Sequence, residues 1–295
     1  MLYLSEFTFP DAEREVSFIM AEKRTCYDSF YPFRILSQRA LERLDFEPIT
    51  ILYGGNGSGK TTAVNVIAEK LGLQRDTLYN RSPFFEDYTA MCRYELRAEI
   101  PSCSRIITSD DVFDYMLNLR AINEGIDRQR EELFQEYIEF KSEKYAQYRL
   151  KSLDDYEEFK RINMARSRTP SKTQSKYIRR FLMDNAREQS NGESAFVYFT
   201  NKIQENGLYL LDEPENSLSP QRQQELTGFL EDSARFFGCQ FVIATHSPFL
   251  LSMRGARIYN LDADPVSTAR WTALPAVRTY YDFFMRHADA FDPQD

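Results

Sequence analysis

Cysteine and histidine are scarce in this sequence of 295 residues, and their scarcity excludes several classes of protein. The four cysteines lie far apart and form no C-x-x-C pair, so the sequence indicates neither a zinc site nor a disulfide framework. Two histidines and dispersed cysteines also leave little from which a nuclease or protease centre could be built. We therefore expect reduced, structural thiols at Cys26, Cys92, Cys103 and Cys239.

Long apolar runs and an excess of positive charge are missing as well. No stretch approaches the roughly 18 uninterrupted apolar residues of a transmembrane helix, and the first residues lack a basic segment followed by an apolar one. The 45 acidic residues outnumber the 37 Lys and Arg residues, and the net charge of −8 repels nucleic acids and acidic membrane surfaces on average. We expect a soluble, cytoplasmic protein that does not insert into membranes and that contacts DNA only locally.

A strand, a glycine-rich turn and a helix follow one another in the first third of the chain. Ile49 to Tyr53 is an apolar, β-branched run that ends in glycines. Thr61 to Leu71 places its apolar residues on one helical face, and Gly72 stands where a C-terminal cap is expected.

A second unit of alternating elements lies near the end of the chain. Gly207 to Leu211 and Gln240 to Thr245 are apolar runs of strand length. Between them, Ser219 and Pro220 favour the start of a helix, and Gly238 favours its end. This β-α-β unit predicts a parallel sheet.

The remaining segments complete the predicted architecture. Residues 2–9 and 16–20 are β-rich runs and predict an N-terminal antiparallel portion; residues 105–108 and 256–261 predict further strands, and residues 279–291 form an amphipathic tail.

The middle of the chain differs from both ends. From about Phe113 to Asn185 it is rich in Glu, Lys, Arg and Tyr, nearly free of glycine and patterned as helices with charged faces. We expect residues 113–189 to form a helical subdomain inserted between the two halves of one α/β core, residues 1–112 and 190–295.

The glycine-rich turn fits the Walker A pattern G-x-x-x-x-G-K-[ST]. Glycines let backbone N–H groups turn inward around phosphates, the lysine reaches the β- and γ-phosphates, and the threonine hydroxyl is a ligand for Mg²⁺. The predicted nucleotide-binding residues are Gly54, Gly55, Asn56, Gly57, Ser58, Gly59, Lys60, Thr61 and Thr62.

Two carboxylates at the end of an apolar strand match the Walker B arrangement. Asp212 is predicted to hold Mg²⁺ together with Thr61, and Glu213 to orient or deprotonate the attacking water. Strands often end in exposed acidic residues, so this pair alone is a moderate signal. Together with the P-loop it strongly indicates a Walker B motif.

His246 directly follows the apolar run Gln240 to Thr245, at the sheet edge where ligands bind in parallel α/β folds. There its imidazole could reach a γ-phosphate. A structural hydrogen bond is the ordinary role of a histidine in this position, and the neighbouring motifs favour the catalytic one.

The order of these motifs resembles that of ABC-type ATPases, and more narrowly the stand-alone bacterial ATPases of the AAA/ABC class. The segment Ser190-Asn191-Gly192-Glu193-Ser194, a polar turn when taken alone, stands where that family has its signature. The resemblance implies that Ser190, Gly192 and Glu193 face the γ-phosphate of a nucleotide held by another subunit.

Further segments extend the resemblance, and one departs from it. Residues 210–215 read L-L-D-E-P-E, residues 216–220 resemble the D-loop, and Tyr31-Pro32-Phe33 matches a short upstream motif with a proposed adenine contact. No clear glutamine stands at the Q-loop position after the strand at residues 105–108, where relatives usually show an acidic residue. Asp111 is our choice for that position, and with it for a further residue of the Mg²⁺ site.

The resemblance implies an α/β P-loop NTPase of the ABC-ATPase type with a mostly parallel central sheet. It further implies a homodimer that forms or tightens with ATP and Mg²⁺ and hydrolyses ATP at a composite site, acting as a switch or motor for an unidentified protein partner. Lys60, Glu213 and His246 would be its catalytic residues.

Other interpretations remain open at this level. An AAA+ motor would place both Walker motifs in one compact core, and a small P-loop kinase would need lid arginines. An ATP-binding subunit of a membrane transporter is the main alternative, although the Q-loop glutamine and the transporter-type signature are missing. The run from Arg161 to Arg180 holds seven basic and no acidic residues and could contact nucleic-acid phosphates in DNA repair or phage defence, although a solvated helical face is the favoured interpretation.

Overall fold

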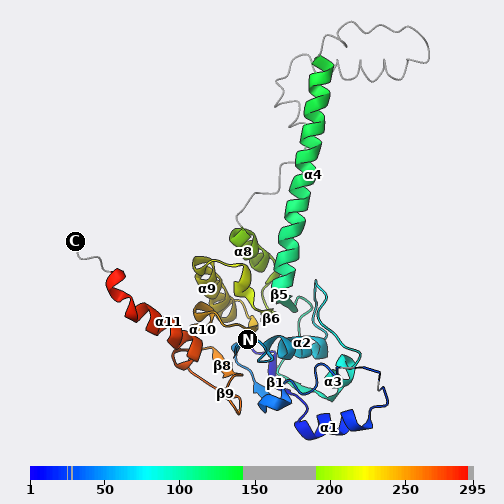
Figure 1. The fold of residues 1–295 in the computed structure, drawn as a ribbon, viewed down its shortest axis with the longest axis vertical. Coiled ribbons are helices and arrows are strands. Elements are labelled where there is room, and N and C mark those ends of the chain that lie inside the picture. Colours follow the sequence, from blue (N-terminus) through cyan, green and yellow to red (C-terminus); the bar gives the residue numbers. More distant parts are fainter. Residues whose placement is uncertain (25, 28, 142–190, 292–295) are drawn as a thin grey trace. The chain divides into compact units, whose positions relative to one another are not determined.

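The computed structural model describes residues 1–24, 26, 27, 29–141 and 191–291. The chain divides into two compact units, one formed by Met1–Asp114 with Ser190–Asp295 and the other by Tyr115–Gln189. Most of the predicted helical subdomain, including the basic run Arg161 to Arg180, lies outside the described residues. Its described part belongs to the long helix α4 (Ser109–Lys141), which Figure 1 shows as one continuous helix.

A six-stranded sheet forms the centre of the first unit. Its strand order is β5-β6-β7-β3-β8-β9, and every neighbouring pair is parallel except β8 with β9. All residues of β3, β6 and β7 are buried, as their apolar sequences require. The strands are β3 (Ile49–Tyr53), β5 (Arg105–Thr108), β6 (Leu208–Asp212), β7 (Gln240–Ala244), β8 (Arg257–Asn260) and β9 (Ser267–Thr268). The predicted α/β fold with a mostly parallel sheet is confirmed.

A smaller antiparallel sheet contains the N-terminus, as predicted. Strand β1 (Leu4–Thr8) pairs with β2 (Arg43–Asp45) on one side and β4 (Arg93–Leu96) on the other. The second β-rich run, residues 16–20, is not a strand, and that prediction was wrong. It lies in helix α1 (Ala12–Ala21), whose first turn is capped by the Asp11 carboxylate, 2.8 Å from the backbone nitrogen of Arg14.

The helices of the first unit follow the predicted signals closely. Helix α2 begins at Lys60, ends at Leu71 and is capped by Gly72 in the left-handed conformation. Ser219 caps α9 as expected, but α9 ends at Phe236, two residues before Gly238. The helices are α2 (Lys60–Leu71), α3 (Phe85–Met91), α8 (Asn191–Lys202), α9 (Pro220–Phe236), α10 (Pro248–Leu251) and α11 (Pro275–Arg286), with 3₁₀ turns η1 (Ser37–Arg39), η2 (Pro214–Ser217), η3 (Trp271–Ala273) and η4 (Ala288–Ala290).

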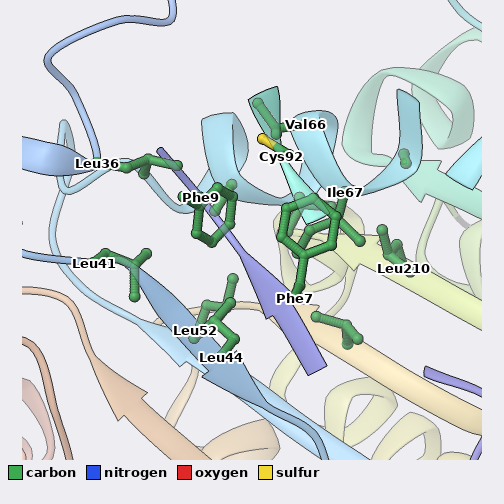
Figure 2. Packing of buried hydrophobic residues seen from close by; sticks show 14 of the residues in the cluster. Phe7, Phe9, Leu36, Leu41, Leu44, Leu52, Val66, Ile67, Cys92 and Leu210 are labelled. Atoms are coloured by element: carbon green, nitrogen blue, oxygen red, sulfur yellow. The ribbon is translucent and has the colours of Figure 1, made fainter. Parts of the chain in front are cut away.

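One continuous apolar core joins the two sheets through α2. Figure 2 shows Phe7 of β1 beside Ile67 of α2, with Leu44 of β2 and Leu52 of β3 close to each other. Each of these side chains is fully buried, so about 1.5–3 kcal/mol of transfer free energy per side chain holds α2 between the sheets. The start of α2, where the P-loop lies, is therefore fixed by the core.

All four cysteines are free; Cys92 and Cys239 are buried, and Cys26 is exposed. Among the described helices, none is long and apolar enough to cross a membrane.

Candidate functional site

The carboxyl ends of five parallel strands carry the candidate residues. The P-loop follows β3, Asp212 ends β6, and His246 lies two residues after β7. Asp111 and Asp262 follow β5 and β8. Since parallel strands end at one edge of their sheet, residues distant in sequence meet at the edge where ligands bind in this class of fold.

The P-loop backbone adopts conformations that glycine favours. Gly57 and Gly59 have φ angles of +79° and +94°, and a Cβ atom on Gly59 would lie 3.0 Å from Leu36. A Cβ on Gly54 would collide with Ser58, so a larger residue is excluded there as well. The loop therefore requires the glycines of the motif for steric reasons.

Lys60 is folded back onto the loop that precedes it. Its ammonium group is buried and donates hydrogen bonds to the carbonyl oxygens of Gly54, at 2.7 Å, and Gly55, at 3.1 Å. The Glu213 carboxylate lies 3.8 Å away. A phosphate in the loop would offer this cation a stronger, charged partner than the two carbonyls.

Thr61 and Asp212, which the sequence predicts to ligate Mg²⁺, are in direct contact. The Thr61 hydroxyl donates to Asp212 Oδ1 at 3.1 Å across a separation of 151 residues. The described residues hold no group of three or more His, Cys, Asp or Glu side chains suited to a metal. A hydroxyl with one carboxylate fits Mg²⁺, which is commonly held by one or two protein oxygens together with water and nucleotide phosphates.

Burial, together with the neighbouring carboxylates of Glu213 and Glu215, raises the pKa of Asp212 to about 7, although the Thr61 hydrogen bond and Lys60 act to lower it. A divalent cation at this position would remove the electrostatic conflict among the three carboxylates. The donor set therefore fits a magnesium ion.

Glu213 occupies a strained backbone position next to Asp212. Its φ of 48° and ψ of 52° lie in the left-handed region, and its N–H donates to the Ala244 carbonyl at 2.9 Å. The side chain is half-buried and accepts a hydrogen bond from Asn216 at 3.0 Å. This conformation holds the carboxylate beside Lys60 at the sheet edge.

His246 lies beside a buried carboxylate that the sequence analysis did not single out. Glu215 Oε1 accepts hydrogen bonds from the Thr245 hydroxyl at 2.6 Å and from the His246 N–H at 3.0 Å. The His246 Nδ1 atom is 3.6 Å from the same oxygen, and the imidazole is 47% exposed. The backbone of His246 is thus fixed while its ring can reach a ligand.

Asp111 helps to cap the first turn of helix α4. One carboxylate oxygen accepts from the Thr108 N–H at 2.6 Å and from its hydroxyl at 2.9 Å, which is a capping box at the start of α4. The other oxygen is buried without a hydrogen-bond partner in the described part of the chain. The predicted metal-site role of Asp111 remains a prediction, because this structural role accounts for only one of its two oxygens.

The structure places only part of the signature segment. Ser190 lies outside the described residues, and Gly192 and Glu193 lie in the first turn of α8. The segment therefore begins a helix, whereas taken alone it predicted a polar turn. Glu193 forms an ion pair with Arg222 of α9 at 3.1 Å, which joins α8 to the helix that follows Walker B.

The upstream motif Tyr31-Pro32-Phe33 approaches the P-loop helix. The Tyr31 hydroxyl lies 3.3 Å from Thr62 Oγ1, and Phe33 is buried in the core. The proposed adenine contact of this motif stays a prediction.

Two further residues at this edge were missed by sequence reasoning. Asp262 accepts a hydrogen bond from the Gly55 N–H at 2.8 Å. Arg75, after α2, stacks on Tyr79 at 4.0 Å, and burial lowers its pKa against the opposing influence of nearby anionic groups, including Asp111 and Asp212. Neither residue belongs to a recognisable motif, so only the folded arrangement reveals them.

Comparison with protein families gives one match. Residues 106–252 match the family model described as "AAA domain, putative AbiEii toxin, Type IV TA system". The matched segment runs from β5 through α10 and includes the Walker B carboxylates and His246. The predicted resemblance to AAA/ABC-class ATPases is confirmed. No curated protein matches the chain.

Solved structures to which the chain is similar include two SMC head domains and an ABC transporter cassette. The Smc head domain of Pyrococcus furiosus is 14% identical with a TM-score of 0.43, and the similarity covers 98% of this chain and 100% of that one. The SMC head domain of Thermotoga maritima is 12% identical with a TM-score of 0.39, covering 91% and 99%. A dimeric bacterial ABC transporter cassette is 14% identical with a TM-score of 0.36, covering 79% and 90%.

Proposed function

We propose that this chain, a protein of the AAA/ABC class, binds ATP with Mg²⁺ and hydrolyses it to ADP and phosphate. The observation that carries the proposal is the 3.1 Å contact between Thr61 and Asp212, which joins the P-loop helix to the Walker B strand. The buried Lys60 beside Glu213 and the family match over residues 106–252 support it.

Each side chain has one task in the proposed reaction. Lys60 and the P-loop N–H groups bind the phosphates, and Thr61 and Asp212 hold Mg²⁺, which would neutralise charge on the phosphates. Glu213 orients the attacking water or takes its proton, an effect worth about 10² to 10⁴ in rate. His246 contacts the γ-phosphate from the neighbouring strand end.

We further propose that two copies form the complete site, as a cytoplasmic homodimer that tightens with ATP. In this arrangement Ser190, Gly192 and Glu193 of one copy face the nucleotide bound to Lys60 of the other. The matched family's description names a toxin of a toxin-antitoxin system. We accordingly propose that the ATP cycle acts as a switch or motor for a partner protein, in phage defence or DNA repair.

The variant Glu213→Gln tests the hydrolytic assignment. The amide keeps the size of the side chain but cannot take a proton, so we expect ATP binding to stay within a few-fold of wild type and hydrolysis to fall by about 10² or more. Phosphate release and nucleotide affinity would be measured in parallel. Glu231→Gln, at a carboxylate on α9 that accepts a hydrogen bond from the Arg254 N–H, is the control and should leave both unchanged. Near-normal turnover of Glu213→Gln would assign the water to another residue.

A further inference from the structure

Glu215, a carboxylate to which no motif assigns a role, lies beside the imidazole of His246. Glu215 is 6% exposed. Its Oε1 atom already accepts two hydrogen bonds, from Thr245 and from the backbone of His246, while its Oε2 atom is buried with no partner among the described residues. A buried carboxylate with unused acceptor capacity is costly unless a further donor or a positive charge approaches it.

The sheet topology explains why this carboxylate meets His246. Strands β6 and β7 are neighbours, and the 3₁₀ turn η2 follows β6 directly and carries Glu215 toward the end of β7. Thr245 and His246 are the first residues after β7, so their donors fall within reach of Glu215. The His246 Nδ1 atom, at 3.6 Å from Oε1, is a small ring rotation away from a hydrogen bond.

We infer that Glu215 is a positioning residue: its carboxylate holds the Nδ1–H of His246 and favours the doubly protonated ring, whose opposite nitrogen, Nε2, donates to the γ-phosphate. The inference rests on the proposed ATPase function. A phosphate is an acceptor, so His246 serves it best when both ring nitrogens carry protons, and a carboxylate at Nδ1 stabilises that form. The bound arrangement then alternates charge, from the carboxylate through the imidazolium to the phosphate.

Other ionisable groups also surround His246 and bear on its protonation. Asp212 and Glu213 lie at the end of the neighbouring strand β6. On the open side, His246 and Glu215 line a groove of about 860 Å³ together with Arg278, Tyr280 and Tyr281 of α11. Arg278 is paired with Asp282 at 3.4 Å. Of these groups, Glu215 is the carboxylate with a direct contact to the imidazole.

The variant Glu215→Gln removes the charge and keeps the shape. Its amide oxygen still accepts from Thr245 and His246, so we expect the fold and the ATP affinity to persist. We expect the maximal turnover to fall by about 10- to 100-fold, as for groups that orient a ligand-binding histidine. Glu215→Asp should recover part of the rate, and Glu231→Gln should match wild type.

A double-variant comparison separates positioning from a merely structural role. If Glu215 acts through His246, then Glu215→Gln in a His246→Ala background should lower turnover by less than about twofold further. Losses that multiply would overturn the inference. Wild-type turnover in His246→Ala would overturn it too, while leaving the ATPase proposal standing.

A measurement without turnover keeps the two proposals distinguishable. The chain has only two histidines, so the imidazole ¹⁵N signals of His246 can be assigned with a His287→Gln variant. We expect the signals to show a proton on Nδ1 of His246 in the wild type and a larger share of the tautomer protonated only at Nε2 in Glu215→Gln. A wild-type His246 protonated only at Nε2 would overturn the inference, whether or not the protein hydrolyses ATP. A complete lack of ATP hydrolysis would separately reject the ATPase proposal.

Discussion

At the scale of single residues, the Asp212 carboxylate carries the largest electrostatic cost of the site. It ends a strand buried on both faces and lies next to Glu213 and Glu215, and these surroundings raise its pKa from 3.8 to about 7. A carboxylate that is costly to ionise without a counter-charge is a strong ligand once a cation arrives, because binding removes the cost. The same residue therefore links metal binding to the stability of the metal-free protein.

This link gives a pH dependence with a definite sign. Because the folded state holds the Asp212 proton more tightly than the unfolded chain, this carboxyl stabilises the fold fully below about pH 4 and loses that contribution as the pH rises through about 7. Asp212→Asn should therefore become more stable than wild type as the pH rises, by roughly 2–4 kcal/mol over that window without Mg²⁺. Urea unfolding of both proteins at several pH values measures it. The control is Asp232→Asn, at an exposed position, for which the stability difference from wild type should stay the same at each pH. A pH-independent difference for Asp212→Asn would contradict the raised pKa of Asp212.

Which residues could be predicted from the sequence depends on how their contacts arise. Lys60, Thr61, Asp212 and Glu213 belong to contiguous motifs whose spacing encodes their geometry. Asp262 acts on the P-loop only because β8 pairs with β3, which places it 2.8 Å from Gly55 across 207 residues. No local pattern contains such information.

Gln240 illustrates the same limit in the core. The sequence predicts that Gln240 lies in a strand, and it is the first residue of β7. Its fully buried side chain also accepts hydrogen bonds from the N–H groups of Tyr3 and Leu4 and donates to the Leu4 carbonyl, which ties β1 to β7. The register between the two sheets decides this role, and the sequence of either strand alone does not.

At the scale of elements, α1 and α2 show why one helix was predicted and the other was not. The apolar residues of α2 repeat at helical spacing over three turns, and Gly72 marks its end. In α1 the short run of Val16, Phe18 and Ile19 looks like a strand, because few residues set its period. The Asp11 cap and the packing of Phe18 and Ile19 against the core favour the helix.

The two ends of α2 provide a matched test of the P-loop backbone. Gly59 and Gly72 both have positive φ, but a Cβ on Gly72 would meet nothing within 4 Å, whereas one on Gly59 would press on Leu36 and Ile35. Gly72→Ala should cost about 1–2 kcal/mol of stability and leave ATP affinity unchanged. Gly59→Ala should lose similar stability and also at least about tenfold in ATP affinity, since the loop must shift. Calorimetric titration with ATP and thermal unfolding separate the two effects, and equal affinities would show that the P-loop tolerates the side chain.

At the scale of the whole molecule, the chain carries both halves of the composite site that we propose. The P-loop precedes α2, and the signature segment begins α8, in the same compact unit. A homodimer with twofold symmetry would place the P-loop of each copy against the signature segment of the other copy, giving two equivalent sites.

Complementation between two inactive chains distinguishes these possibilities. Lys60→Ala removes phosphate binding but keeps the signature, and Gly192→Arg blocks the signature but keeps the P-loop. In a mixed dimer the P-loop of the Gly192→Arg chain faces the intact signature of the Lys60→Ala chain, so an equal mixture should recover about a quarter of wild-type turnover. Mixing either variant with Lys60→Ala/Gly192→Arg double-variant protein supplies the control, because that chain offers neither half and no activity should return. Activity of the Gly192→Arg chain by itself would mean that each chain hydrolyses ATP alone, and an equal mixture as inactive as its parts would contradict a site shared between two copies.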